Sequence, residues 1–267
     1  MSEGNPMKVT VSAADPGTEV VVMDSRRIKV ASGGGRLDLK LAPGLYKARF
    51  KAGGFSQDRL FEVADQAVEV EGPRLSLRTP VPLAGSASTH EYHEGPARAL
   101  STLQAHAIGQ GSEIGLFARD SHKKPGEGQL AELWRGLQLQ RLSGIAVADF
   151  SNEGVRDANL GYVAARLELD PGTYLLTLMR EFGPAVQLPV VANAGWRTTV
   201  FLDCTDTNSH RELDLYGASI MMSRPSEPFH PGDELLRLTE LAKLSLLNGR
   251  VSIDASSLAN MLDEKFS

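Results

Sequence analysis

One eight-residue pattern, Leu-x-Leu-x-Pro-Gly-x-Tyr, occurs twice in the chain, at residues 39–46 and 167–174. Apolar and polar residues alternate before and after the first Pro-Gly pair, which is the period of a strand with one buried face. Proline fixes φ near −65° and glycine tolerates positive φ, so Pro-Gly favours a tight turn. The pattern therefore predicts a hairpin with one buried side, and it predicts that hairpin twice.

Two more segments match in the same order. Residues 17–22 (Gly-Thr-Glu-Val-Val-Val) resemble residues 111–116 (Gly-Ser-Glu-Ile-Gly-Leu), and the alternating segment 67–70 resembles residues 197–202. Three matches in one order favour two copies of one fold. The alternative is that any β protein supplies Pro-Gly turns and alternating strands.

The spacing between matching positions grows along the chain. Gly17 and Gly111 are 94 residues apart, whereas Pro43 and Pro171 are 128 apart. The second copy should therefore carry about 34 extra residues, from roughly residue 122 to 160.

The run Pro43-Gly44-Leu45-Tyr46, followed by alternating residues and then Gly53-Gly54-Phe55, resembles carboxypeptidase regulatory-like and PEGA-type domains. The resemblance covers residues 17–78, and in the second copy 111–121 and 163–202. There Phe182-Gly183 reverses the family's order of glycine and aromatic residue. It implies small β-sandwiches of prealbumin-like topology. Such domains are mostly non-catalytic and bind partners, ligands or other domains.

These observations predict a mainly β protein with two tandem antiparallel β-sandwiches, a helical insertion in the second and a C-terminal helical hairpin. The first sandwich should span residues 1–80, and a linker with a short helix residues 81–110. The second should span residues 111–223, with its insertion at about 122–160. A Pro-rich loop and C-terminal helices should follow at residues 224–267.

The segment between the copies is typical of a linker. Residues 79–88 are rich in Pro, Gly, Ser and Ala. A helix is predicted from Pro96 to Ile108, because proline suits the first helical turn and Gly109 follows the expected end.

The insertion contains a helical pattern, formed by Leu130, Leu133, Trp134 and Leu137 at i, i+3, i+4 and i+7. Residues 145–150 resemble a strand, so we expect a helix with a strand or hairpin. Trp134 is a candidate partner anchor, because tryptophan is enriched at interface hot spots. The alternative is that it packs the insertion onto the sandwich.

A leucine-rich helix is predicted from Asp233 to Asn248-Gly249, with an acidic start and a glycine stop. A second helix should begin at about Asp254. The two can clasp the second copy as a hairpin or present a leucine-rich face to another protein. The candidate partner-binding residues are Trp134, Leu258, Met261, Leu262 and Phe266.

Composition excludes several functions. The chain has 28 Lys and Arg against 33 Asp and Glu, a net charge of −5, and no long basic run, so we expect no nucleic-acid partner. No apolar run approaches the roughly 18 residues of a membrane span, and the start lacks a secretory signal. Cys204, the single cysteine, cannot form an internal disulfide. We therefore expect a soluble cytoplasmic protein that binds no membrane.

Candidate chemistry is sparse. In His90-Glu91-Tyr92-His93-Glu94 the histidines are three apart, whereas a zincin needs four, even if His106 adds a third nitrogen. A solvated linker fits this segment better. Cys204 has His210 six residues away, with Asp203 and Asp206 beside it, but a nucleophilic thiol needs a base within hydrogen-bond reach.

The glycine clusters fit neither a phosphate-binding loop nor a dinucleotide-binding turn. We therefore predict no catalytic residue, metal or cofactor.

The leading hypothesis is a non-enzymatic protein–protein interaction or adapter module. Its leucine-rich tail resembles chains that accompany caspase-like or CHAT peptidases, so an alternative is a target or regulator of such a peptidase in a bacterial defence system. A second alternative is a ligand- or carbohydrate-binding sandwich, and an enzyme built on Cys204 or His90 and His93 comes last.

Overall fold

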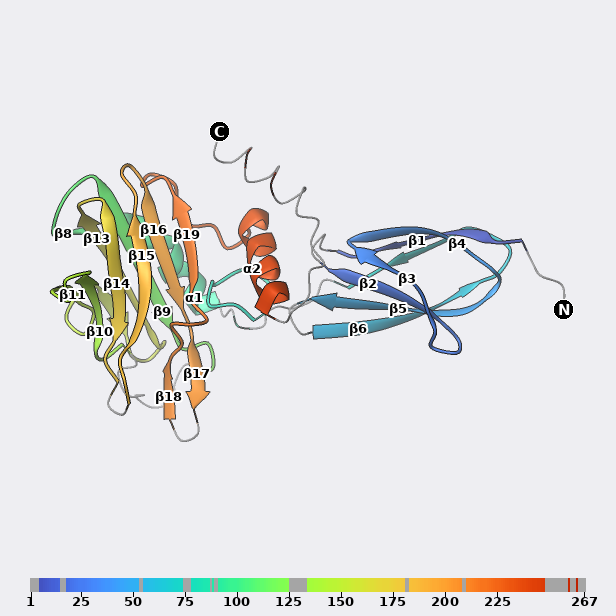
Figure 1. Ribbon diagram of the computed structural model, residues 1–267, viewed down its shortest axis with the longest axis horizontal. Coiled ribbons are helices and arrows are strands. Elements are labelled where there is room, and N and C mark those ends of the chain that lie inside the picture. Colours follow the sequence, from blue (N-terminus) through green and yellow to red (C-terminus); the bar gives the residue numbers. More distant parts are fainter. Residues whose placement is uncertain are drawn as a thin grey trace. The chain divides into compact units, whose positions relative to one another are not determined.

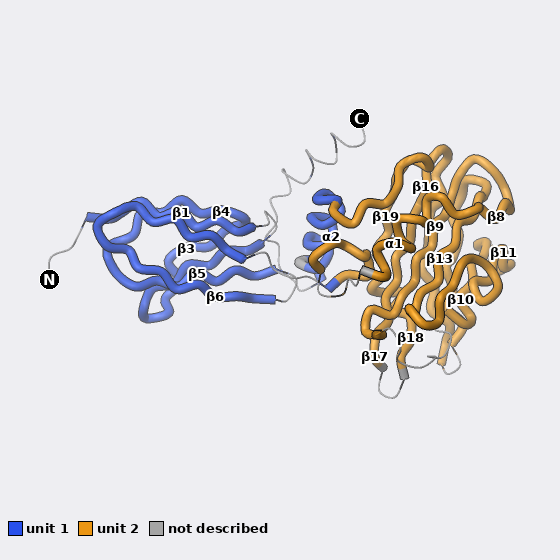
Figure 2. The backbone as a smooth tube through the Cα atoms, turned by 180° about the vertical axis from the view of Figure 1, so that it is seen from behind, with its two compact units in different colours: residues 1–78, 233–267 blue, residues 79–232 orange. Residues whose placement is uncertain are grey.

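The computed structural model describes residues 5–14, 18–52, 55–73, 78–86, 88, 91–124, 134–180, 183–207, 210–247, 259 and 263. The chain forms two units, one of residues 1–78 with 233–267 and one of residues 79–232 (Figure 2). Strands predominate in both units, so the prediction of a mainly β protein is confirmed (Figure 1). No described helix is long and apolar enough to cross a membrane.

The first unit contains two sheets. The smaller sheet has the order β4 (Arg36–Leu41), β1 (Met7–Ser12) and β7 (Val68–Glu71), and the larger has the order β3 (Lys29–Gly34), β2 (Glu19–Asp24), β5 (Gly44–Ala52) and β6 (Phe55–Val63). Neighbouring strands are antiparallel except β1 and β7, which are parallel. Val9 and Val11 of β1 share one core with Val20 and Val22 of β2. The two sheets therefore enclose a common interior.

The C-terminal helix α2 (Glu234–Leu247) contributes to this same core. It confirms the predicted leucine-rich helix, and Asp233 Oδ1 accepts a hydrogen bond from the Leu236 N–H (3.1 Å) at its start. We expected the helix to lie on the second copy or to face a partner. Instead Leu238 and Leu241 are buried in the core of the first unit, because this stripe finds apolar neighbours there.

The second predicted helix lies almost wholly outside the described residues. Ala259 and Asp263 are helical and exposed. Four of the candidate partner-binding residues belong to the undescribed part, so the structure places none of them: Leu258, Met261, Leu262 and Phe266.

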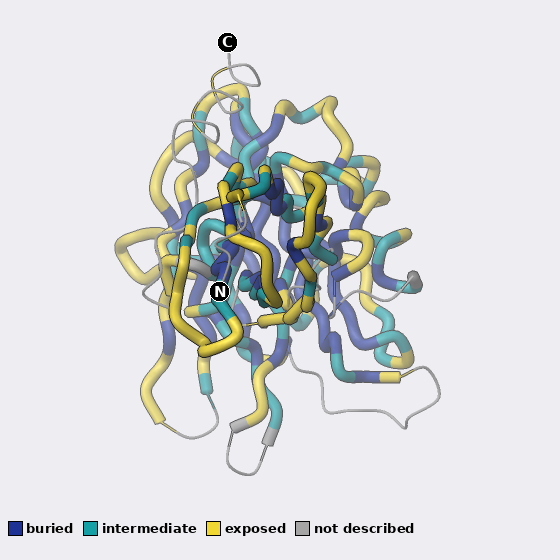
Figure 3. Tube along the Cα trace, turned by 90° about the vertical axis from the view of Figure 1, so that its right-hand side faces the viewer, coloured by how far each residue is buried: buried dark blue, intermediate teal, exposed yellow. Residues whose placement is uncertain are grey.

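The second unit also has two sheets around one core. One has the order β11 (Ala146–Asp149), β10 (Leu137–Arg141), β14 (Gly172–Leu178) and β15 (Val186–Ala192). The other has the order β12 (Val155–Asp157), β13 (Tyr162–Leu169), β9 (Ser112–Arg119), β16 (Arg197–Leu202) and β19 (Ser219–Ser223), with β8 (His106–Ala107) also paired to β13. A separate hairpin joins β17 (Cys204–Thr207) to β18 (His210–Leu213). Buried residues run along the strands, and exposed residues gather at many of the connecting loops (Figure 3).

Seven strands of the second unit repeat the pairing of the first. β9 pairs with β13 antiparallel and with β16 parallel, as β1 pairs with β4 and β7. β10 pairs with β11 and β14, and β14 with β15, as β2 pairs with β3 and β5, and β5 with β6. The register shifts at the matching place in both units, between Val22 and Met23 and between Leu139 and Gln140.

The Pro-Gly turns do not form hairpins, so that prediction is wrong. The expected strands exist, but β4 and β5 lie in different sheets, as do β13 and β14. At each crossing a tyrosine hydroxyl donates to the carbonyl four residues earlier, Tyr46 to Ala42 (2.9 Å) and Tyr174 to Asp170 (2.8 Å). Alternation of apolar and polar residues determines which face of a strand is apolar. It does not determine whether two consecutive strands pair in one sheet or lie in two sheets packed against each other.

The predicted match of residues 17–22 with 111–116 is also wrong. The pairing equates β2 with β10 and β1 with β9. Within residues 122–160, β10 and β11 belong to the shared set of seven strands, so this described part is not an added insertion. Leu130 and Leu133 of the predicted helix lie outside the described residues. From residue 137 onward the chain forms a strand, in which Leu137 and Leu139 are buried with period two.

The linker helix begins and ends earlier than predicted, and His106–Ala107, expected within the helix, form the short strand β8. Helix α1 spans Glu91–Ala99 with Pro96 inside it, and a 3₁₀ turn, η1 (Leu100–Thr102), follows. Its first turn is fixed by tertiary contacts, since the Tyr92 hydroxyl donates to the Lys123 carbonyl (2.6 Å). These contacts override the preference of proline for a first helical turn.

The turn between β2 and β3 has the same geometry as the turn between β10 and β11. In residues 24–28 and 141–145 the first and last residues, and the first and fourth, are joined by backbone hydrogen bonds of 2.8–3.0 Å. The fourth residue has positive φ in both turns, Arg27 at 66° and Gly144 at 83°. Arginine therefore holds a left-handed conformation that glycine adopts at no steric cost.

We predict that Gly144→Ala lowers the unfolding free energy of the second unit by about 1 kcal/mol, because alanine must adopt the left-handed conformation. A Cβ at this position would meet no atom within 4 Å, so the substitution tests the backbone alone. Both tryptophans, Trp134 and Trp196, lie in residues 79–232, and intrinsic fluorescence during urea unfolding therefore reports on this unit.

The reciprocal change, Arg27→Gly, should raise the stability of the first unit by about 0.5 kcal/mol, since the entropy that glycine loses offsets part of the relieved strain. Amide hydrogen exchange in β2 and β5 measures this unit separately. Destabilisation by Arg27→Gly would show that contacts of the arginine side chain outweigh its backbone strain.

Candidate functional site

Cys204 is a buried thiol at the start of β17, with 6% of its surface exposed. Burial, followed by the charges of Asp120 and Asp203, raises the pKa of the Cys204 thiol well above its ordinary value. Cys204 pairs in register with Leu213, whereas His210 pairs with Thr207 at the other end of the hairpin. A nucleophilic cysteine needs a lowered pKa and a nearby base, so the arrangement favours a structural thiol.

His93 is also buried, and its two ring nitrogens are both engaged. Nε2 is 2.8 Å from the Leu160 carbonyl oxygen, to which it must donate, so Nδ1 is the acceptor for Arg119 Nη1 at 3.5 Å. The expectation of a solvated linker at this point is therefore wrong. His90 lies outside the described residues, and His106 pairs elsewhere. Where the structure is described, no group of three His, Cys, Asp or Glu residues is placed to hold a metal ion.

Arg119, at the end of β9, organises the segment before α1. Its guanidinium is 1% exposed and donates to the carbonyls of Thr79 (2.9 Å), Pro80 (3.1 Å) and Val81 (3.3 Å). Burial lowers the pKa of Arg119 to about 10, which leaves it charged at neutral pH. The fork of five N–H donors can satisfy three consecutive carbonyls at once. Residues 79–81 are thereby tied to the strand.

Two aspartates beside Cys204 hold the neighbouring loops. Asp120 is fully buried, and its Oδ2 accepts a hydrogen bond from Arg211 Nη1 at 2.7 Å. Asp203 Oδ1 accepts from the N–H groups of Ser121 (2.9 Å) and Cys204 (2.8 Å). Both carboxylates therefore serve the architecture of the β17–β18 hairpin.

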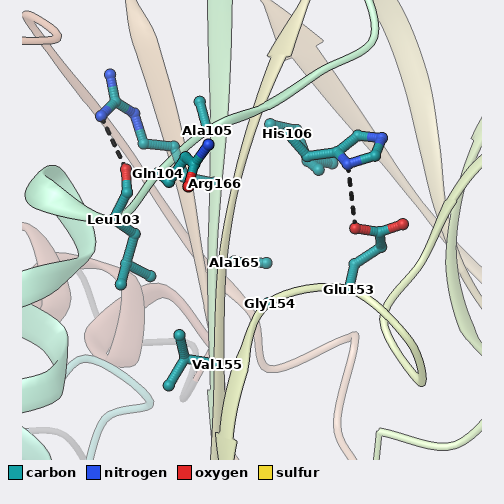
Figure 4. Close-up of a pocket in the computed structure, with 10 residues that line it drawn as sticks. Leu103, Gln104, Ala105, His106, Glu153, Gly154, Val155, Ala165 and Arg166 are labelled. Carbon is teal, nitrogen blue, oxygen red and sulfur yellow. Dashed lines mark hydrogen bonds and ion pairs between the residues drawn. The ribbon is translucent and has the colours of Figure 1, made fainter.

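The described cavity of the second unit lies at the edge of its larger sheet and has a volume of about 300 Å³ (Figure 4). It coincides with an interruption in strand pairing along β13. On the side away from β9, residues 162–164 pair with β12 and residues 167–168 pair with β8. Ala165 and Arg166 lie between these two short strands, and no described strand pairs with them on this side.

One side of the cavity is an exposed ion pair. His106 Nδ1 lies 3.3 Å from Glu153 Oε2, and the two side chains are 52% and 30% exposed. They point toward each other from β8 and from the loop before β12 (Figure 4). These two groups are the ionisable side chains of the lining that are most open to an incoming ligand.

The opposite side is a fixed wall. Arg166 donates from Nη1 to the carbonyls of Ser101 and Leu103, both at 3.1 Å. Its Nε and Nη2 contact both carboxylate oxygens of Glu113, at 3.0 and 2.6 Å, and this hydrogen bonding raises the pKa of Arg166. Arg166 therefore shapes the cavity and holds the 3₁₀ turn against β13, and its charge is paired with Glu113, which also lies 3.9 Å from Arg197.

Among the predicted site residues, Trp134 is 4% exposed and belongs to the core of the second unit. This burial agrees with the alternative, in which Trp134 packs its own segment onto the rest of the unit. Of the cavity residues, sequence reasoning named only His106, and it did so as a possible metal ligand. The sequence near Glu153 and Arg166 does not indicate a site. Glu153 contacts His106, and Arg166 contacts Glu113, only because the fold brings these distant residues together.

We predict that Arg119→Lys lowers the unfolding free energy of the second unit by about 2 kcal/mol or more. Lysine keeps the charge but cannot donate to three carbonyls from fixed positions, and buried acceptors are left unsatisfied. Urea unfolding followed by tryptophan fluorescence measures the change. Arg98→Lys, at a residue 54% exposed in α1, is the matched control and should leave the midpoint in place. Equal effects of the two variants would contradict an anchoring role for Arg119.

A second prediction concerns the thiol. In the native protein at pH 8, a disulfide reagent should react with Cys204 at least about 100-fold more slowly than in urea, because the thiol is buried and protonated. Since folding raises its pKa, the protonated thiol adds stability that is lost as the pH rises above about 8.5. Cys204→Ala should flatten that part of the stability profile. Native labelling as fast as in urea would instead indicate an accessible thiolate.

Comparison with known proteins leaves the function to be inferred from this geometry. No protein-family model matches the chain, and no curated protein matches it. No residue role is therefore transferred from a relative.

Proposed function

We propose that the protein is a non-enzymatic interaction module built from two copies of one β-sandwich, and that the second copy binds an extended segment of a partner protein. The repeated strand pairing, the shared register shift and the two tyrosine contacts support the two-copy architecture. The same pairing is compatible with the resemblance to carboxypeptidase regulatory-like domains, which stays part of the proposal.

The environment of the reactive side chains supports a binding role. The Cys204 thiol is buried with a raised pKa, and His93 directs both ring nitrogens to groups within its own unit. Asp120 and Asp203 hold a loop and a hairpin. Each of these groups thus has a structural task that accounts for its position.

The observation that carries the proposal is the two-residue gap in the pairing of β13. A strand edge without a neighbour presents N–H and C=O groups that an extended peptide can pair with. A strand advances about 3.3 Å per residue, so two or three residues of a partner would span the interval between β12 and β8. The cavity of about 300 Å³ at this point is at the lower end of ligand-site sizes.

The ion pair beside the gap indicates what the segment carries. Glu153 is an acceptor for a basic side chain or a main-chain N–H, and His106 is its present partner. A segment that replaces this histidine contact with a Lys or Arg contact would satisfy the carboxylate in the bound state.

A carbohydrate-binding surface receives less support. Sugar sites usually offer an open aromatic face, but Trp134 is buried and the ring of Trp196 is covered by the Arg224 guanidinium at 3.9 Å. The alternative of a target or regulator of a caspase-like peptidase rests on the C-terminal tail and stays a prediction.

A photo-crosslinking residue tests the proposed site. We expect the crosslinker at Val155, which lines the cavity and is 51% exposed, to give a discrete adduct with a partner in native lysate. At Val191, which is 48% exposed on β15 in the other sheet, it should give none. Glu153→Gln should reduce the yield at Val155 by about threefold or more, since it removes one charge-assisted contact.

Two outcomes would contradict the proposal. One is an equal crosslink at Val155 and Val191, which indicates non-specific association. The other is no adduct at Val155 under conditions in which the protein is folded and the crosslinker is active.

A further inference from the structure

Among its described strands, the first unit has no counterpart of one strand that flanks the corresponding sheet of the second unit. In the second unit β16 pairs on its outer side with β19, antiparallel, from Arg197 opposite Ser223 to Phe201 opposite Ser219. β7, the counterpart of β16, is the terminal strand of its sheet, and none of the described strands pairs with its outer side. The same position in the fold is thus filled in the second unit, whereas no described strand fills it in the first.

Register makes the correspondence specific. Val68 of β7 lies opposite Val9 of β1, and Thr198 of β16 lies opposite Ile114 of β9. Val9 and Ile114 are themselves equivalent, because they face Leu39 and Leu167 of the two repeated segments. Residues 67–71 therefore occupy the place of residues 197–201, which are the residues that β19 covers.

The outer edge of β7 carries a distinct chemistry. Val70 is buried in the core and Val68 packs against it partly exposed, whereas Glu69 and Glu71 are exposed on the other face. Their neighbours on β1 are the uncharged Thr10 and Ser12. None of the ion pairs formed by described residues includes either glutamate.

A strand that pairs with the outer edge of β7 would have to meet two requirements. Its residues opposite Val68 and Val70 would lie on the core side of the sheet, where β19 places Met222, which is half-buried, and Ile220, which is 45% exposed. Its residues opposite Glu69 and Glu71 would lie beside two carboxylates, and opposite charges across a strand pair stabilise the pairing. Alternating apolar and basic residues meet both requirements.

We propose that β7 is a strand-addition site that binds an extended, alternately apolar and basic segment of a partner protein, antiparallel to β7. Backbone hydrogen bonds to the open edge supply affinity, and the two glutamates select for the basic residues. This site is separate from the proposed cavity of the second unit and concerns the other unit, so either can fail without the other.

A synthetic strand tests the site on the full chain. The probe is a fluorescein-labelled, end-capped nine-residue peptide of alternating valine and lysine, and its anisotropy should rise saturably with protein concentration. Glu69→Lys/Glu71→Lys should weaken binding by about threefold to thirtyfold, the range expected for two cross-strand charge pairs. The same variant should bind the matching valine–glutamate peptide more tightly than the wild type does.

Two controls separate strand addition from general attraction. Glu62→Lys/Asp65→Lys reverses the same number of exposed charges in the first unit outside β7, on β6 and in the loop before β7, and it should leave the affinity within about twofold. A peptide N-methylated on alternate residues keeps its charge but cannot complete a ladder, and it should not bind.

Several results would overturn the proposal. They are an absence of saturable binding, equal loss in both double variants, and equal binding of the N-methylated peptide. A further one is a dimer in sedimentation velocity that Glu69→Lys/Glu71→Lys abolishes, because it would make a second copy of the chain the occupant of β7. Far-UV circular dichroism confirms that each variant is folded.

Discussion

Each unit depends on a pairing between its first and last shared strands. β1 is held between β4 and β7, and β9 between β13 and β16, and in both cases the last strand runs parallel to the first. Parallel neighbours cannot be joined by a short turn, so a long crossover connects them, and in each unit this crossover contains all four strands of the second sheet. This closure buries Val9 and Val11 in one unit and Ile114 and Leu116 in the other. It also leaves the outer edge of the last strand as the place where another strand can be added.

Local pattern was sufficient to predict several of the strands but not their partners. Residues 36–41 alternate cleanly and form β4, and the tyrosine after Pro-Gly recurs because its hydroxyl fastens the crossing between sheets. Whether two consecutive strands pair or cross is decided by contacts far apart in sequence, such as Leu41 with Met7. The alternation of apolar and polar residues at Leu137 and Leu139 did not lead to the prediction of a strand, because Leu137 also fits a helical spacing that includes Trp134.

The candidate sites were less accessible to sequence reasoning than the strands. The cavity exists because β8 and β12 cover different parts of β13, and its ion pair joins His106 to Glu153 across 47 positions. Arg119 is the last residue of an apolar strand, and from the sequence alone an arginine at that position is expected to be exposed to solvent. Only the carbonyls of residues 79–81 give its burial a reason. A buried cation of this kind needs acceptors that no local window contains.

The differences between the two copies concentrate at sheet edges. The closing pair, the register shift, the β2–β3 turn and the tyrosine crossing are retained in both units. The second unit adds β8 and β12, which pair with β13, and β19, which pairs with β16. The counterparts of β13 and β16 in the first unit, β4 and β7, are the two terminal strands of their sheet. An added strand satisfies edge N–H and C=O groups that water would otherwise hydrate, so edges can change without altering the core. Binding specificity in a chain of this design therefore depends on which edges its own strands leave open.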